Sequence, residues 1–302
     1  MKIGYPCINL TIGCKGDRTF RLKSYSEQRL IETVTNNINC LAAMLTFNVE
    51  HDLLFFRVTS DLVPFASHRV CQFDWHTYFK DQLTAIGSFI KSHNIRISMH
   101  PGQYTVLNSQ DNEIFARSIK ELEYHADVLD ALGLDASAKI QLHVGGVYRD
   151  KRKSVQQFID RYRNLNKRIK QRLVIENDDR SYTADDCIRI YEETGVPVLF
   201  DVFHHELNHS HSSITDVLAT ITKTWQAQDG IPMVDYSYHH PGGLRVSHAK
   251  SIDSADFERF LTITQPYDFD IMLEIKDKET SALKAVEIAR GDMRFFHGKF
   301  TH

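Results

Sequence analysis

Short apolar runs recur along the chain with helical patterns between them. Eight runs are dominated by consecutive Val, Ile, Leu and Phe, as in strands that are buried on both faces of a parallel sheet. We expect strands at residues 2–6, 53–59, 96–101, 139–145, 172–178, 196–204, 232–239 and 270–277. Eight strand–helix units in 302 residues favour a closed (β/α)₈ TIM barrel over an open doubly wound sheet, and neither GxGxxG nor GxxxxGK[ST] occurs.

Capping residues predict where several helices begin and end. Ser24 and Glu27 fit a capping box at the start of the first helix. Thr183 with Asp186 predicts another helix start, and Gly195 predicts the end of that helix. Further helix starts are expected near Asp74, Asp111, Ser154, Ser213, Ser254 and Lys278.

Composition indicates one domain covering residues 1–302. The chain is 42% hydrophobic and 25% charged, and it has neither a membrane-length apolar run nor a signal peptide. We therefore expect a cytoplasmic monomer without membrane contacts. The five cysteines are odd in number and lack CxxC spacing, which favours reduced thiols over a disulfide framework.

Metal-type side chains stand at the ends of five expected strands. They are His100, His143, Glu176, Asp201 and Glu274. In a (β/α)₈ barrel the C-terminal strand ends carry the active site. Several carboxylates at one rim repel one another unless cations compensate, so the pattern predicts a cluster of metal ions. Imidazole with carboxylate suits Zn²⁺ and Mn²⁺.

Two or three adjacent divalent ions are suited to phosphodiester hydrolysis, because they activate water and stabilise both the attacking and the departing oxygen. Sugar isomerases also use histidines and carboxylates at a barrel rim, so the ligands alone leave the reaction open. A stretch rich in Lys and Arg follows the fourth expected strand. We expect Lys151, Arg152 and Lys153 in a loop on the catalytic face, where they would contact phosphates.

Specific strings narrow this choice. They are GYPCINLTIG (4–13), LVPFASH (62–68), SMHPGQY (98–104), LHVGG (142–146), IENDDR (175–180) and DVFHH (201–205). Together they resemble the UV damage endonuclease family, from about residue 3 to residue 277. The resemblance implies a barrel related to endonuclease IV that nicks duplex DNA immediately 5′ of cyclobutane dimers and 6-4 photoproducts. The nick needs no ATP and leaves a 3′-hydroxyl and a 5′-phosphate.

The resemblance also implies roles for individual residues. The implied metal ligands are His100, His143, Glu176, Asp201, His204, His248 and Glu274, with Glu176 bridging two ions. His68 would contact a phosphate or a metal, and we group it with Glu176 and His143 as catalytic. Gln103 and Tyr104 would fill the gap left in the duplex, and Tyr5 and Asn9 would line the lesion pocket.

The seventh expected strand departs from the family pattern. Some members carry a Lys that can be carboxylated and, two residues later, a His, where this chain has Met233 and Asp235. Met233 cannot become a carbamate ligand, so the third ion is in question unless Asp235, His239 or His240 changes its coordination. If Asp235 replaces the His, the second ion would lie among Glu176, Asp201, Asp235 and Glu274, which is an oxygen-rich ligand set. We therefore expect two or three Mn²⁺ ions, with Zn²⁺ and Mg²⁺ as alternatives.

Three other functions stay open on the sequence. An endonuclease specific for abasic sites would share the metals and differ in its pocket. A metal-dependent sugar isomerase or epimerase would act on free sugars. A lesion-binding protein without catalysis would result if the changes in strand seven spoiled the metal site.

Overall fold

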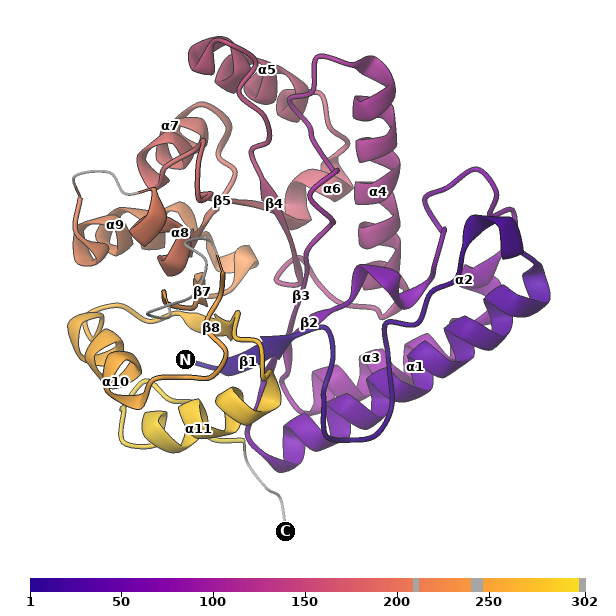
Figure 1. The fold of residues 1–302 in the computed structure, drawn as a ribbon, viewed down its shortest axis with the longest axis horizontal. Helices are drawn as coiled ribbons and strands as arrows, with labels where there is room; N and C mark the ends of the chain where they lie inside the picture. The colour runs from indigo at the N-terminus through magenta and orange to yellow at the C-terminus, as the bar shows by residue number, and fades with distance from the viewer. Residues whose placement is uncertain (209–211, 240–246, 299–302) are drawn as a thin grey trace.

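Eight parallel strands close into a barrel in the computed structural model, which describes residues 1–208, 212–239 and 247–298 (Figure 1). The strands are β1 Ile3–Pro6, β2 Phe55–Val58, β3 Arg96–Met99, β4 Lys139–His143, β5 Leu173–Glu176, β6 Val198–Asp201, β7 Met233–Tyr236 and β8 Asp270–Leu273. Each strand pairs with the next, and β8 pairs with β1. The (β/α)₈ barrel predicted from the apolar runs is thus confirmed.

Helices lie around the barrel between successive strands (Figure 1). They are α1 Glu27–Glu50, α2 Trp75–Tyr78, α3 Lys80–Ser92, α4 Asn112–Ala131, α5 Lys151–Arg163, α6 Lys167–Arg172, α7 Ala184–Thr194, α8 Val202–Leu207, α9 Ile214–Ile221, α10 Ser254–Ile263 and α11 Glu279–Ala289. Buried apolar side chains fill the space between these helices and the outer faces of the strands.

Two helix boundaries show where capping chemistry succeeded and failed as a predictor. The capping box of Thr183 with Asp186 is present, and Gly195 ends α7 in the left-handed region. The proposed box of Ser24 and Glu27 is wrong, because Ser26 caps α1 and accepts a hydrogen bond from the Arg29 backbone N–H. Both serines precede the helical pattern at near-equal spacing, so hydroxyl position alone could not separate them.

The first two strands approach each other closely. A Cβ atom placed on Gly4 would lie 1.6 Å from the backbone oxygen of Phe55. Any side chain here would force the strands apart. Gly4 therefore lets β1 pair with β2 and close the barrel.

The N-terminal end of the barrel is closed by buried ion pairs. Lys139 Nζ lies 2.5 Å from Asp229 Oδ1, and Arg96 Nη1 lies 3.3 Å from Asp270 Oδ2. Arg96 also donates to the backbone oxygens of Asp229 and Ile231. Each buried cation is satisfied by a carboxylate or by carbonyl groups, as burial of charge requires.

The expectation of five reduced cysteines is wrong for one pair. Cys14 and Cys40 form a disulfide with a Cα–Cα distance of 5.8 Å. It joins the segment after β1 to α1, and Cys7, Cys71 and Cys187 are free thiols. An odd number of cysteines without a CxxC motif does not exclude a single disulfide between cysteines that are distant in sequence. Here the chain folds back on itself and brings Cys14 and Cys40 together. None of the described helices combines the length and apolar character needed to cross a membrane.

Candidate metal centre

The barrel interior is layered because strand side chains alternate with a period of two. An apolar layer contains Phe55, Val174, Leu199, Met233 and Met272, all fully buried. Two residues further along the same strands or just beyond them stand the polar side chains of Arg57, Glu176, Asp201, Asp235 and Glu274. Strand register pairs His143 with Glu176, and Asp201 with Asp235. Short regular strands thus place the polar groups together at the C-terminal rim.

The first group of metal-type side chains consists of His100, His143 and Glu176. Glu176 Oε1 lies 2.8 Å from His143 Nε2 and 3.1 Å from His100 Nε2. The two imidazoles are partly exposed, whereas the carboxylate is 1% exposed. Two nitrogens and one oxygen therefore converge at the mouth of the barrel.

The second group shares Glu176 with the first. Glu176, Asp201 and Asp235 each offer an oxygen within 4.8 Å of the other two, and all three are buried. The structure places Asp235 beside Glu176 and Asp201, and its role as a metal ligand stays a prediction. Glu176 lies between the two groups, where a bridging carboxylate would have to be.

The pKa values of these carboxylates are shifted in opposite directions. Burial alone would raise the pKa of Glu176, but His143 and His100 hold it well below its ordinary range. Burial, with Glu274 and Glu176 nearby, raises the pKa of Asp201 to about 7 despite the opposing charge of His204. Burial also raises the pKa of Asp235, which outweighs the effect of Arg57. Crowded carboxylates of this kind are stabilised by a cation.

The donor set fits divalent metal ions. Nδ1 of His100 and of His143 is buried and makes no hydrogen bond within the described part of the chain. The Nε2 atoms of both rings face Glu176 Oε1, so they are the nitrogens that could share an ion with this carboxylate. Three ligand atoms within 4.8 Å of one another suit one ion that binds each at about 2.0–2.2 Å.

Comparisons with known proteins identify the family. The family model "UV-endonuclease UvdE" matches residues 1–294. The UV DNA damage endonuclease of Clostridium perfringens (strain 13 / Type A) is 38% identical over 288 residues, which is 95% of this chain and 70% of that protein. The chain belongs to the UV-endonuclease UvdE family. The metal-type rim is therefore that of a nuclease family.

Solved structures agree with the UvdE assignment. SacUVDE is 44% identical, with a TM-score of 0.92 over 96% of this chain and 98% of that chain. Endonuclease IV from Thermus thermophilus is 15% identical, with a TM-score of 0.57 over 83% and 93% of the two chains. This second likeness concerns the barrel fold alone.

Three further residues predicted as ligands in this UvdE chain lie beside the two groups. His204 Nδ1 lies 3.3 Å from Asp201 Oδ2, and His248 Nε2 lies 3.6 Å from Glu274 Oε2. The His204 and His248 rings are 6.3 Å apart. Within the described residues, His204, His248 and Glu274 belong to neither close-packed group. A third ion at these residues stays a prediction, and His240 lies outside the described residues.

Two polar residues of the UvdE rim escaped the sequence analysis. Arg57 is 3% exposed and contacts Asp235 and Glu274, and Gln141 is fully buried. Although burial would lower the pKa of Arg57, the two carboxylates raise it, so Arg57 is a cation. Arg57 in turn lowers the pKa of Glu274 to about 2 against the effect of burial. The sequence did contain a signal for both residues, because each is a polar residue within an apolar strand run, LLFFRVT for Arg57 and KIQLHVG for Gln141.

The predicted probing residues occupy an exposed turn after β3. The Thr105 N–H donates to the Gly102 oxygen, so Gln103 and Tyr104 are the central residues of the turn. Tyr104 is 69% exposed. Its ring packs on Gly102, where a Cβ would lie 2.5 Å from the ring.

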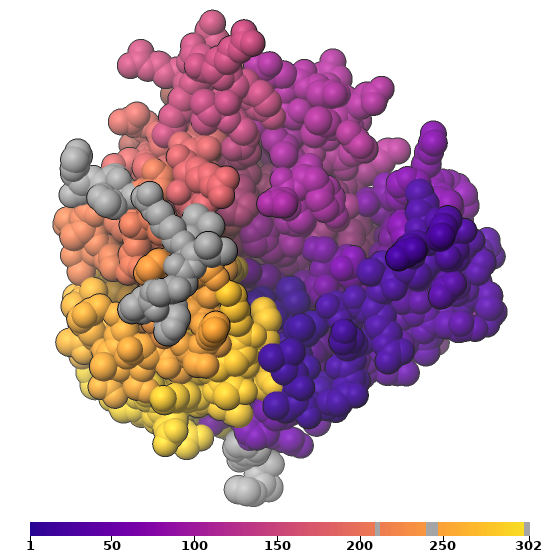
Figure 2. All heavy atoms as spheres, in the orientation of Figure 1, coloured from indigo at the N-terminus to yellow at the C-terminus, as the bar shows by residue number. Residues whose placement is uncertain are grey.

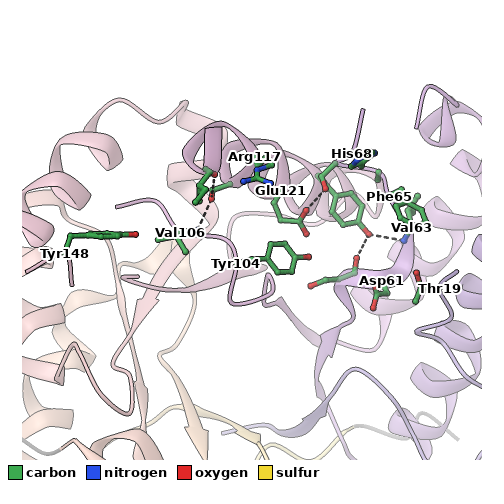
Figure 3. Close-up of a pocket in the computed structure, with 16 residues that line it drawn as sticks. Thr19, Asp61, Val63, Phe65, His68, Tyr104, Val106, Arg117, Glu121 and Tyr148 are labelled. Atoms are coloured by element: carbon green, nitrogen blue, oxygen red, sulfur yellow. Dashed lines mark hydrogen bonds between the residues drawn. The ribbon is translucent and has the colours of Figure 1, made fainter. Parts of the chain in front are cut away.

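A cavity of about 590 Å³ opens beside this turn. Figure 3 shows Tyr104 amid the residues that line it, with Glu121 and Asp61 among its neighbours. His68 lines the same cavity and is exposed, and it belongs to neither close-packed metal-type group. The structure thus places His68 with the probing turn, whereas the sequence placed it with the catalytic residues.

Tyr5 and Asn9 are buried rather than open to a ligand. The Tyr5 hydroxyl donates to Asn48 Oδ1, and Asn9 Nδ2 donates to the Tyr5 oxygen at 3.0 Å. Asn9 Oδ1 accepts from the N–H groups of Thr11 and Ile12. These hydrogen bonds tie the segment that follows β1 to the buried Tyr5 and to Asn48 of α1.

The basic residues after β4 lie in a helix and not in the predicted loop. Asp150 caps α5, so Lys151 begins its first turn. Lys151 Nζ lies 2.5 Å from Asp186 Oδ2 and stands over the Tyr182 ring. Arg152 and Lys153 are exposed. Because Asp150 caps α5, the helix starts earlier than the predicted Ser154.

We expect Mn²⁺ binding to weaken as the pH falls. The pKa of Asp201 is raised to about 7, and Asp201 and Glu176 raise the pKa of His204 to about 9 against the effect of burial. Below these values protons occupy the groups and must leave before an ion binds. The association constant of the ion held by Glu176, Asp201 and Asp235 should fall at least about tenfold between pH 8 and pH 6. Equilibrium dialysis of the chelator-treated protein measures this, and a pH-independent constant would contradict it.

Proposed function

We propose that this chain is a divalent-metal-dependent UV DNA damage endonuclease. It incises the phosphodiester immediately 5′ of cyclobutane pyrimidine dimers and 6-4 photoproducts in duplex DNA, without ATP, and leaves a 3′-hydroxyl and a 5′-phosphate. The observation that carries the proposal is Glu176, which is shared by two groups of metal-type side chains at the rim of a UvdE-family barrel. The domain is residues 1–302, acting as a cytoplasmic monomer.

The rim residues would hold two divalent ions that serve the reaction. His100, His143 and Glu176 would hold one ion, and Glu176, Asp201 and Asp235 a second. Bound divalent ions would activate water and stabilise the charge on the departing 3′-oxygen. Burial holds the carboxylate ligands in fixed positions. His100 and His143 are partly exposed, so the DNA backbone can approach the site from their side.

Lesion recognition belongs to the exposed turn. A damaged dinucleotide is poorly stacked, so extruding it from the duplex costs less than extruding normal bases. Tyr104 and Gln103 protrude from a turn next to the rim and would fill the resulting gap. Exposed Arg152 and Lys153 supply positive charge for phosphates, and His68 contacts the DNA beside Tyr104.

The face drawn in Figure 2 supports a large substrate. It is hollowed near its centre, between the indigo N-terminal segments and the orange and yellow C-terminal ones. A free sugar needs only a small enclosed pocket, whereas a duplex needs an open, shaped surface.

Mn²⁺ is expected to support turnover better than Zn²⁺. The second group contains carboxylates alone, and oxygen ligands favour Mn²⁺ or Mg²⁺ over the softer Zn²⁺. Chelator-treated protein reconstituted with each ion should show at least about tenfold faster incision with Mn²⁺. Equal or faster incision with Zn²⁺ alone would contradict the preference.

A single gel assay tests the proposed function. Purified protein with Mn²⁺ is incubated with an end-labelled duplex carrying one cyclobutane dimer, beside undamaged and abasic duplexes. A nick immediately 5′ of the dimer with a 3′-hydroxyl end supports the proposal. Cleavage confined to the abasic duplex would indicate an abasic-site endonuclease. Binding to the damaged duplex without any cleavage would indicate a lesion-binding protein.

A further inference from the structure

Arg57 is the buried cation of the polar layer that follows the inner apolar layer at the C-terminal rim of the barrel. It lies in β2, two residues after Phe55 of the inner apolar layer, and is 3% exposed. An unpaired guanidinium in this position would be strongly destabilising, so its partners must be close and well oriented. Those partners belong to the candidate metal centre.

The guanidinium contacts two carboxylates at once. Nη2 donates to both oxygens of Asp235, at 2.9 and 2.7 Å, and Nη1 donates to Glu274. Arginine suits such a site because its planar fork matches carboxylate geometry. The cation therefore contacts two of the four carboxylates that were predicted to hold the second ion, Asp235 and Glu274.

Gln141 extends the contacts of Arg57 to the bridging carboxylate. Its Oε1 accepts from Arg57 Nη2 at 2.8 Å, and its Nε2 donates to Asp235 Oδ2 at 2.5 Å and to Glu176. Glu176 is thereby held through one oxygen by Gln141 and faces the two histidines with the other. Asp235 uses three hydrogen-bond positions on Arg57 and Gln141, which leaves a carboxylate little capacity for an ion.

We infer that Arg57 is a fixed cation within the second metal site, where it weakens binding of a second divalent ion and leaves the group of His100, His143 and Glu176 as the tight site. This inference rests on the metal centre of the proposed function. Its physical basis is Coulomb repulsion, because a guanidinium that shares Asp235 with the incoming ion opposes a second cation at short range.

Titration with Mn²⁺ alone tests the inference. Free Mn²⁺ is counted from its electron paramagnetic resonance signal as chelator-treated full-length protein is titrated at pH 8. The wild-type protein should bind one ion at least about tenfold more tightly than the second. In Arg57→Met the second ion should bind at least about tenfold more tightly than in wild type, with the first ion little changed.

Two further variants separate charge from shape and from general damage to the fold. Arg57→Lys keeps the charge and loses the fork, so its second ion should bind nearly as in wild type. Arg96→Met is the matched control, because Arg96 is also a buried strand arginine paired with an aspartate, at the opposite end of the barrel. It should leave both Mn²⁺ affinities unchanged.

Each outcome decides the matter. Second-ion binding that is unchanged or weaker in Arg57→Met overturns the inference, and incision by the wild-type protein would then leave the proposed function standing. If Arg57→Met does not fold, two equal affinities in the wild-type protein overturn it just as well. A wild-type protein that binds no Mn²⁺ removes both the inference and the metal centre beneath it.

Discussion

Glu176→Gln is expected to reduce incision of a dimer-containing duplex by roughly a thousandfold, because a shared metal ligand contributes several kcal/mol to transition-state stabilisation. The amide keeps the size of the side chain and its contact with Gln141, but it loses the charge that faces His100 and His143. Binding to damaged duplex should change little, since the exposed turn and basic residues are untouched. Single-turnover incision and a gel-shift titration measure the two effects separately.

The control for this variant is Glu193→Gln, which makes the same change at an exposed residue that pairs with Arg163. It should incise at the wild-type rate. Full incision by Glu176→Gln would remove the central residue of the proposed mechanism.

Tyr104→Ala is expected to lower the preference for damaged over undamaged duplex by roughly 10- to 100-fold, from the loss of base stacking. The ring is 69% exposed, so its removal should cost the fold little. Because Tyr104 is not among the metal-type groups, Mn²⁺ affinity should stay at the wild-type value. The measurement is the ratio of incision rates on paired duplexes that differ only by the dimer.

Tyr78→Ala provides the matched control, since Tyr78 is an exposed tyrosine on α2, with 52% of its surface open to solvent. Its preference for damaged duplex should equal that of the wild-type protein. An unchanged preference in Tyr104→Ala would assign lesion reading to other residues.

The sequence predicted the parts of the structure that follow from local periodicity. Glu176 and Asp201 could be placed at one rim because parallel strands end together and side chains alternate, whereas Asp235 was assigned there only through the resemblance to the family. The capping box of Thr183 likewise depends on neighbours within one turn.

Features that depend on long-range contacts were missed. The charge of Arg57 could be read from the sequence, but its partners Asp235 and Glu274 lie 178 and 217 residues away. The disulfide of Cys14 with Cys40 depends on how the β1–α1 segment folds back on its helix. Lys151 was misplaced for a local reason, because Asp150, the residue before it, caps α5 and converts an expected loop into the first turn of that helix.

The apolar layer inside the barrel has a consequence for how such enzymes diverge. Phe55, Val174, Leu199, Met233 and Met272 separate the metal-type rim from the ion pairs of Lys139 and Arg96 at the other end. A change of ligand at residue 235 therefore leaves the contacts that anchor the barrel floor intact. Lineages could therefore exchange a ligand at the rim without disturbing the ion pairs at the other end of the barrel, provided that Arg57 keeps a carboxylate partner such as Glu274.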